Sequence, residues 1–143
     1  MAAHKKFEII PEDIGVRMRV QGKTCRELFR NALAGLAAYM KPDAASLSKS
    51  RQQAKEEISI ETVDLNSLLV DFLSGVIGYA DGRGAVFTGI TFKKFGENFL
   101  SGELNGVVTD QFDNEVSAVS YSDVDIRKNP KTRLYEAIVT FEV

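Results

Sequence analysis

Two acidic segments near opposite ends of the chain carry the residue types best suited to binding chemistry. Glu12 and Asp13 stand at the start of one apolar-alternating segment, and Glu142 precedes Val143 at the close of another. Carboxylate and backbone oxygens are the ligands that Ca²⁺ and Mg²⁺ prefer in proteins. If the strands that bear these segments lie side by side, two or three oxygen ligands converge in a way that suits such an ion. Composition and spacing do not establish that the strands are neighbours.

The other reactive side chains support few catalytic schemes. His4 is the only histidine, so triads, histidine-rich metal sites and most histidine general-base schemes are excluded within one chain. Cys25 falls in the expected first turn of a helix, where the helix dipole would lower the pKa of a thiol. The more common role at such a position is that of a small buried residue, and no partner base is visible. A thiol enzyme is therefore the least favoured interpretation.

Two further patterns have a simpler structural explanation. Gly82-Arg83-Gly84 shares its glycines with phosphate-binding loops, but no Gly-Lys-Ser/Thr is present and no helix pattern follows, which favours a tight turn. Arg17 and Arg19, with Lys23 nearby, could form a basic strip for RNA. A solvated face of a strand is the more common outcome for such a charge pattern.

Composition restricts the class of protein. The chain has 143 residues, with 44% hydrophobic and 27% charged residues, which are ordinary values for one globular domain. A net charge of −2 argues against a surface built for extensive phosphate neutralisation. No apolar run approaches the roughly 18 residues that span a bilayer. A single cysteine cannot form an internal disulfide, and we expect a cytoplasmic protein.

Hydrophobic periodicity indicates the elements that must position the acidic segments. Alternation over residues 14–20 predicts a strand with one apolar and one basic-polar face, and residues 7–11 predict a short strand before it. Thr24 and Glu27 form a capping box ahead of a helical pattern that stops before Pro42.

A second helix is expected after a charged loop at residues 41–57 and a brief strand at residues 58–60. Asp64 is its N-cap, Gly78 is its expected end, and residues 81–84 form a turn. Its apolar positions recur at helical spacing: Leu65, Leu68, Leu69, Phe72, Leu73, Val76 and Ile77.

The rest of the chain is strand-like. Strands are expected at residues 85–88, 90–95, 98–104, 115–121 and 133–143. In the last strand one face carries Tyr135, Ala137, Val139, Phe141 and Val143, and the other carries Glu136, Thr140 and Glu142. Two helices packed on a mostly antiparallel sheet or sheets of about seven strands make an α+β fold, in a single domain over residues 1–143.

Three blocks, in the same order over almost the whole chain, resemble the archease family. Residues 7–16, followed by Gly22-Lys23-Thr24, are similar to the family's opening aromatic, His-Thr-Ala-Asp-Ile/Val-Gly and Gly-Lys/Asp-Thr. Residues 64–73 are close to Asp-Leu-x-x-Leu-Leu-x-x-Phe-Leu. Residues 115–121 are similar to Glu-Val-Lys-Ala-Val-Thr-Tyr, and Phe141-Glu142-Val143 is similar to the closing Phe-Asp-Ile/Val.

The resemblance implies a cytoplasmic helper protein that is not itself an enzyme. Archeases assist a GTP- and metal-dependent RNA ligase that joins 2′,3′-cyclic phosphate or 3′-phosphate ends to 5′-hydroxyl ends, as in tRNA splicing. They promote guanylylation of the ligase and multiple turnovers. The ligase would thus be the protein partner, and RNA would be met only through it. The family's metal ligands correspond to Asp13, Glu142 and Val143 here.

Three departures from the family pattern leave an alternative open. Ile10-Pro11-Glu12 replaces the family's His-Thr-Ala, Ser117 replaces the lysine of the third block, and Glu142 replaces the penultimate Asp. Glu12 adds a carboxylate and is a candidate accessory ligand, so Ca²⁺ or Mg²⁺ binding could survive. The alternative is a diverged binding or chaperone module of the same fold that no longer serves RNA ligase. The sequence leaves the metal's identity, the RNA substrate and the oligomeric state open.

Overall fold

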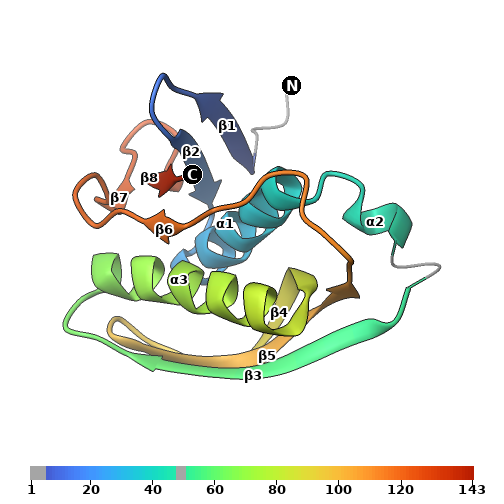
Figure 1. The fold of residues 1–143 in the computed structure, drawn as a ribbon. Coiled ribbons are helices and arrows are strands. Elements are labelled where there is room, and N and C mark those ends of the chain that lie inside the picture. The colour runs from blue at the N-terminus through green and yellow to red at the C-terminus, as the bar shows by residue number, and fades with distance from the viewer. Residues whose placement is uncertain (1–5, 48–50) are drawn as a thin grey trace.

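The two long helices of this protein lie between two antiparallel sheets (Figure 1). The computed structural model describes residues 6–47 and 51–143, which form three helices and eight strands. The helices are α1 (Cys25–Met40), α2 (Ala44–Leu47) and α3 (Leu65–Arg83). The strands are β1 (Phe7–Pro11), β2 (Val16–Gly22), β3 (Gln53–Glu61), β4 (Ala85–Phe95), β5 (Phe99–Val108), β6 (Ala118–Val119), β7 (Arg127–Lys128) and β8 (Tyr135–Glu142). The α+β fold predicted from the sequence is confirmed.

Helix α1 begins and ends where the sequence predicts. The Thr24 hydroxyl accepts a hydrogen bond from the backbone N–H of Glu27 at 3.0 Å. The Glu27 carboxylate in turn accepts from the backbone N–H of Lys23 at 3.1 Å, so two helix-terminal donors are satisfied together. At the other end, the N–H of Lys41 donates to the carbonyl of Ala37 just before Pro42.

Helix α3 is longer than predicted. Its N-cap is Asp64, as expected, and the carboxylate accepts from the N–H of Ser67 at 2.8 Å. The expected end at Gly78 and the turn at residues 81–84 are wrong, because the helix continues to Arg83. Gly78 and Gly82 face solvent and merely weaken the helix, whereas Gly84, at φ 65°, adopts the left-handed conformation that ends it.

The first sheet has the strand order β1-β2-β8-β6, with β7 also paired to β8. Strands β2 and β8 are antiparallel neighbours in a register that runs from Val16 opposite Phe141 to Gly22 opposite Tyr135. Their inward side chains pack on α1 and are fully buried, as Met18 and Val139 show at 0% exposure. Residue 14, predicted to lie in the strand, lies instead in the β1–β2 turn, where Ile14 is 92% exposed.

The second sheet has the order β3-β5-β4. Strand β3 occupies nine residues, including positions 53–57, so the predicted loop at residues 41–57 is wrong over this part. Strand β4 joins the two strands expected at residues 85–88 and 90–95, with irregularities of register at Phe87/Gly89 and Phe92/Lys94. Each irregularity interrupts the alternation of apolar and polar residues, so the sequence predicts two strands where the structure has one.

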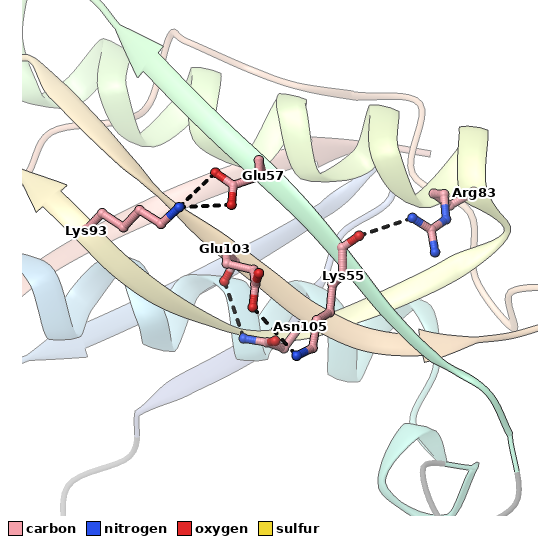
Figure 2. Close-up of polar contacts among 6 residues, drawn as sticks. All are labelled: Lys55, Glu57, Arg83, Lys93, Glu103 and Asn105. Atoms are coloured by element: carbon pink, nitrogen blue, oxygen red, sulfur yellow. Dashed lines mark hydrogen bonds and ion pairs between the residues drawn. The ribbon is translucent and has the colours of Figure 1, made fainter.

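Charged side chains cover the solvent face of the second sheet (Figure 2). Lys93 contacts both carboxylate oxygens of Glu57, at 2.9 and 3.1 Å, and Lys55 lies 3.9 Å from Glu103. Arg83, at the end of α3, donates to the backbone carbonyl of Lys55 at 3.1 Å. Exposed ion pairs of this kind add little stability, so their main effect is to orient side chains on this face.

The region after β5 has less strand than predicted. Of residues 115–121, only Ala118–Val119 form a strand, β6, and a second two-residue strand, β7, appears at Arg127–Lys128. Both strands pair with β8, so β8 supplies the backbone partners of β6 and β7.

One hydrophobic core joins the two sheets through the helices. Phe29 of α1 packs on Phe72 of α3, with ring centroids 5.8 Å apart, and edge-to-face on Phe95 of β4 at 5.0 Å. The core therefore includes residues from both helices and both sheets. Among the residues that the structure describes, none of the helices has the length and apolar character needed to cross a bilayer.

The packing of α1 on the first sheet makes a testable prediction about glycine. A Cβ on Gly35 would lie 2.3 Å from the sulfur of buried Met18, whereas a Cβ on Gly82 would meet no atom within 4 Å. Gly35→Ala should lower the free energy of unfolding by about 1–3 kcal/mol, because the core cannot accept the extra methyl group. Gly82→Ala is the matched control and should raise it by up to about 1 kcal/mol. Urea denaturation followed by circular dichroism measures both, and equal effects would contradict the described packing.

Candidate functional site

The strand register brings the two acidic segments to the same end of the first sheet. Pro11 pairs with Val16 across the β1–β2 turn, and Val16 pairs with Phe141 of β8. Residues 12–15 therefore form a turn beside the last residues of β8. The adjacency that the sequence left open is present: the strand after Asp13 is the direct neighbour of the strand that carries Glu142.

Gly15 allows the turn to approach β8 this closely. Its φ is 81°, in the left-handed region, and a Cβ on it would lie 2.6 Å from the carbonyl oxygen of Phe141. A side chain at this position would both strain the backbone and push the turn away from β8. The position of Asp13 relative to Glu142 thus depends on a glycine two residues after Asp13.

The three carboxylates at this end of the sheet have different surroundings. Glu12, Asp13 and Glu142 are all exposed. Glu12 forms an ion pair with Arg17, at 3.5 Å between the nearest oxygen and Nε. To serve as the accessory ligand predicted from the sequence, the Glu12 side chain would have to leave Arg17.

The backbone of Glu142 is held by Ser117. Both the N–H and the hydroxyl of Ser117 donate to the carbonyl oxygen of Glu142, at 2.8 and 3.0 Å. Strand β6 continues this contact, with Ala118 opposite Glu142. The residue that stands where the archease pattern has lysine therefore lies against the acidic end of β8, as a neutral donor.

The oxygen ligands at this end of the sheet are of the kind that a hard divalent cation prefers, but they are too few to fill its coordination shell. Asp13 and Glu142 offer side-chain carboxylates and Val143 a backbone oxygen, which suits Ca²⁺ or Mg²⁺. Within residues 6–47 and 51–143, no group of three or more His, Cys, Asp or Glu side chains is arranged to hold a metal ion. Solvent or a partner protein would have to supply the remaining ligands, as is usual for Mg²⁺.

Cys25 does not have the environment of a reactive thiol. Partial burial, and secondarily the negative charge of Glu97, raise the pKa of the Cys25 thiol. This is the opposite of the helix-dipole effect considered from the sequence, because the loop carrying Glu97 approaches the same helix end. A thiolate nucleophile is disfavoured.

The proposed basic strip is interrupted by acids. Arg17 is paired with Glu12, and Arg19 lines a pocket of about 510 Å³ that also contains Asp123, Asp125 and Glu136. Mixed charge of this kind does not form a surface for phosphate groups.

A polar contact that the sequence does not predict joins Tyr121 to α3. The hydroxyl of Tyr121 donates a short hydrogen bond to the carboxylate of Asp71 on α3. This bond, together with burial, raises the pKa of Tyr121. Tyr121 belongs to the third block of the archease resemblance, but Asp71 falls at a position that the second block leaves unspecified, so no sequence signal links the two residues.

Comparison with known proteins now gives the family. The model of the archease protein family matches residues 7–143. The chain belongs to the archease family. Archease of Methanosarcina mazei is 26% identical over 132 residues, which cover 87% of this chain and 88% of the relative. Archease of Aeropyrum pernix is 28% identical over 118 residues, covering 75% and 77%.

Solved structures share the fold. The solution structure of a Methanobacterium thermoautotrophicum protein aligns with a TM-score of 0.71 at 21% identity, covering 96% of this chain and 99% of that one. The crystal structure of a Thermotoga maritima archease, described as a possible chaperone, aligns with a TM-score of 0.65 at 14% identity, covering 99% and 100%. The two-sheet arrangement around α1 and α3 is thus that of other archease folds.

The close approach at Gly15 makes a prediction for stability. Gly15→Ala should lower the free energy of unfolding by about 1–3 kcal/mol, because alanine is strained at positive φ and its methyl group meets the Phe141 carbonyl. Gly89→Ala in β4 is the control, since a Cβ there meets nothing within 4 Å. Thermal denaturation compares the two variants. A loss at Gly89 as large as that at Gly15 would contradict the special role of this turn.

Proposed function

We propose that this archease-family protein is an accessory protein of a GTP-dependent RNA ligase and is not itself an enzyme. The observation that carries the proposal is the β2–β8 register, which places the turn bearing Asp13 beside Glu142. The family match over residues 7–143 supports it. The ligase acts in tRNA splicing or RNA repair, and this protein promotes its guanylylation and its multiple turnover.

The acidic end of the first sheet is the part presented to the ligase. Asp13 and Glu142 hold exposed carboxylates there, on a turn and a strand end whose backbones are fixed by Gly15 and Ser117. When present, a divalent cation supplies positive charge that helps order metal or nucleotide in the ligase. Asp13, Glu142 and the Val143 backbone oxygen would hold it, with Glu12 as an accessory group. RNA is met only through the ligase, in the cytoplasm.

Ile14 and Val143 give this acidic end an apolar border. Ile14 is 92% exposed at the tip of the turn, and Val143 is 63% exposed at the end of β8. Apolar side chains bordered by charged ones are also the composition of protein–protein interfaces. The acidic end therefore has the mixed apolar and charged character of a protein contact.

A second candidate function is a binding or chaperone module that does not serve RNA ligase. Ser117 favours it, because a neutral serine, bonded to the Glu142 carbonyl, stands where the family pattern has a positively charged lysine. The segment Ile10-Pro11-Glu12 favours it as well, since it supplies no histidine before Asp13.

Cation binding provides a direct test of the acidic end. Calorimetric titration at pH 7 should detect Ca²⁺ or Mg²⁺ binding, and Asp13→Asn or Glu142→Gln should each weaken it by about tenfold or more, since each removes a charged ligand. Asp81→Asn, an exposed acid on α3, is the control for net charge alone. Absence of binding by the unmodified protein, or an equal loss with Asp81→Asn, would remove the proposed site.

Ligation itself distinguishes the two candidate functions. The organism's RNA ligase, used below the concentration of an RNA with 2′,3′-cyclic phosphate and 5′-hydroxyl ends, should turn over more often when this protein is added. Asp13→Asn should lose the stimulation while keeping its melting temperature within about 2 °C, because an exposed substitution alters stability little. No change in rate, together with no binding to the ligase, would favour the second candidate.

A further inference from the structure

We propose that the groove between α3 and β3 binds an extended segment of a partner protein by strand addition, and that this segment alternates basic and small apolar residues. This surface lies in the second sheet and is separate from the acidic end of the first. It gives the protein a second interaction site, which does not depend on the proposed role in RNA ligation.

The groove has a volume of about 440 Å³ and a partly apolar floor. Ile58 and Ile60 of β3 form one side, and Gly75, Gly78 and Tyr79 of α3 form the other. A Cβ on Gly75 would lie 3.3 Å from the end of the Ile58 side chain, whereas a Cβ on Gly78 would meet nothing within 4 Å. The groove is therefore narrow at Gly75 and open at Gly78, with room for a small side chain.

Strand β3 is an edge of its sheet, because within residues 6–47 and 51–143 it pairs with β5 alone. Hydrogen bonds at its two ends define which residues face β5: the N–H of Thr62 donates to Asn98, and the carbonyl of Gln52 accepts from Val108. Even-numbered residues therefore direct their backbone groups at β5, and odd-numbered residues direct theirs at the outer edge, beside α3. The outer edge is a template for another strand.

Arg83 occupies one end of this edge. Its guanidinium donates to the outward carbonyl of Lys55 at 3.1 Å (Figure 2). The guanidinium also contacts the carboxylate of Glu56 at 2.9 Å. The contact with Lys55 confirms the direction of the odd-numbered carbonyls and closes the edge at that end. The stretch from Glu57 to Glu61 is left for an added strand.

Charge specifies the incoming segment. Glu57 and Glu61 are exposed on the solvent face of β3. Glu57 is already bound by Lys93, so a lysine of the incoming segment would share that carboxylate with Lys93. Asp71, which accepts the hydrogen bond from Tyr121, lines the groove on the α3 side. An added strand would place alternate side chains beside these two glutamates and direct the others into the groove. Lysines suit the first positions and valines the second. Arg83 at the closed end disfavours a basic residue of the segment at that end.

Nuclear magnetic resonance with a synthetic probe tests the proposal. The probe is a seven-residue peptide of alternating lysine and valine, blocked at both ends, added to the full chain labelled with ¹⁵N. Amide shifts should concentrate at residues 57–61 and 75–79. The peptide with glutamate in place of lysine should bind about tenfold more weakly or not at all. Shifts centred on residues 12–14 and 142–143, or equal binding of the acidic peptide, would overturn the proposal.

Two glycines on one helix provide a matched pair of variants. Gly78→Leu places a side chain in the open part of the groove and should weaken peptide binding by about tenfold or more. Gly82→Leu adds the same side chain to the same helix, also with no atom within 4 Å, and should leave binding unchanged. Neither variant should lower the melting temperature, because leucine favours helix over glycine. Equal binding by both variants would refute the groove as the site.

The outcome is independent of RNA ligation. Gly78→Leu should leave any stimulation of the ligase within about twofold of the unmodified protein, because Gly78 lies in the groove between α3 and β3 and not at the acidic end of the first sheet. Loss of stimulation in Asp13→Asn with peptide binding retained would show that the two surfaces act separately. A loss of both properties in Gly78→Leu would contradict two separate sites.

Discussion

The pairing of β2 with β8 is the constraint on which the rest of the structure depends. It joins residues near the beginning of the chain to residues at its end through seven consecutive register pairs. One face of the pair buries Met18, Val20 and Val139 completely against α1. The other face carries mostly charged and polar side chains, with Ile138 among them. A shift of one residue would exchange these faces, so burial of the apolar face enforces the register.

The same register gives the acidic end its geometry without any direct bond between the acids. Asp13 is exposed, and what holds it near Glu142 is the hairpin that the core locks in place. Gly15 sets how closely the turn can approach, and Ser117 fixes the backbone on the far side of β8. Binding groups that are exposed yet mounted on a rigid support retain both access and orientation.

Local signals made part of the fold predictable. The starts of α1 and α3 were predictable because the N-caps Thr24 and Asp64 accept hydrogen bonds from backbone N–H groups only three residues further along the chain. The end of α3 could not, since Gly78 looks like a terminator unless its solvent-facing position is known. Strand β3 was hidden because its outward charges are satisfied across the sheet, as Glu57 is by Lys93. Strands β2 and β8 are neighbours in space but far apart in the sequence. Sequence patterns could therefore identify the acidic residues but could not predict that they lie at the same end of one sheet.

The position of β8 in the chain has a consequence for biosynthesis. Residues 16–22 leave the ribosome well before residues 135–141. Strand β2 therefore has no β8 to pair with while the intervening helices and the second sheet are synthesised. During that interval β2 is an open strand edge in the nascent chain, which is the kind of surface that mispairs or aggregates. Arg17 and Arg19 alternate along β2, and charged side chains on an exposed strand disfavour such association. Residues usually assigned to the finished surface thus also protect the molecule before it is complete.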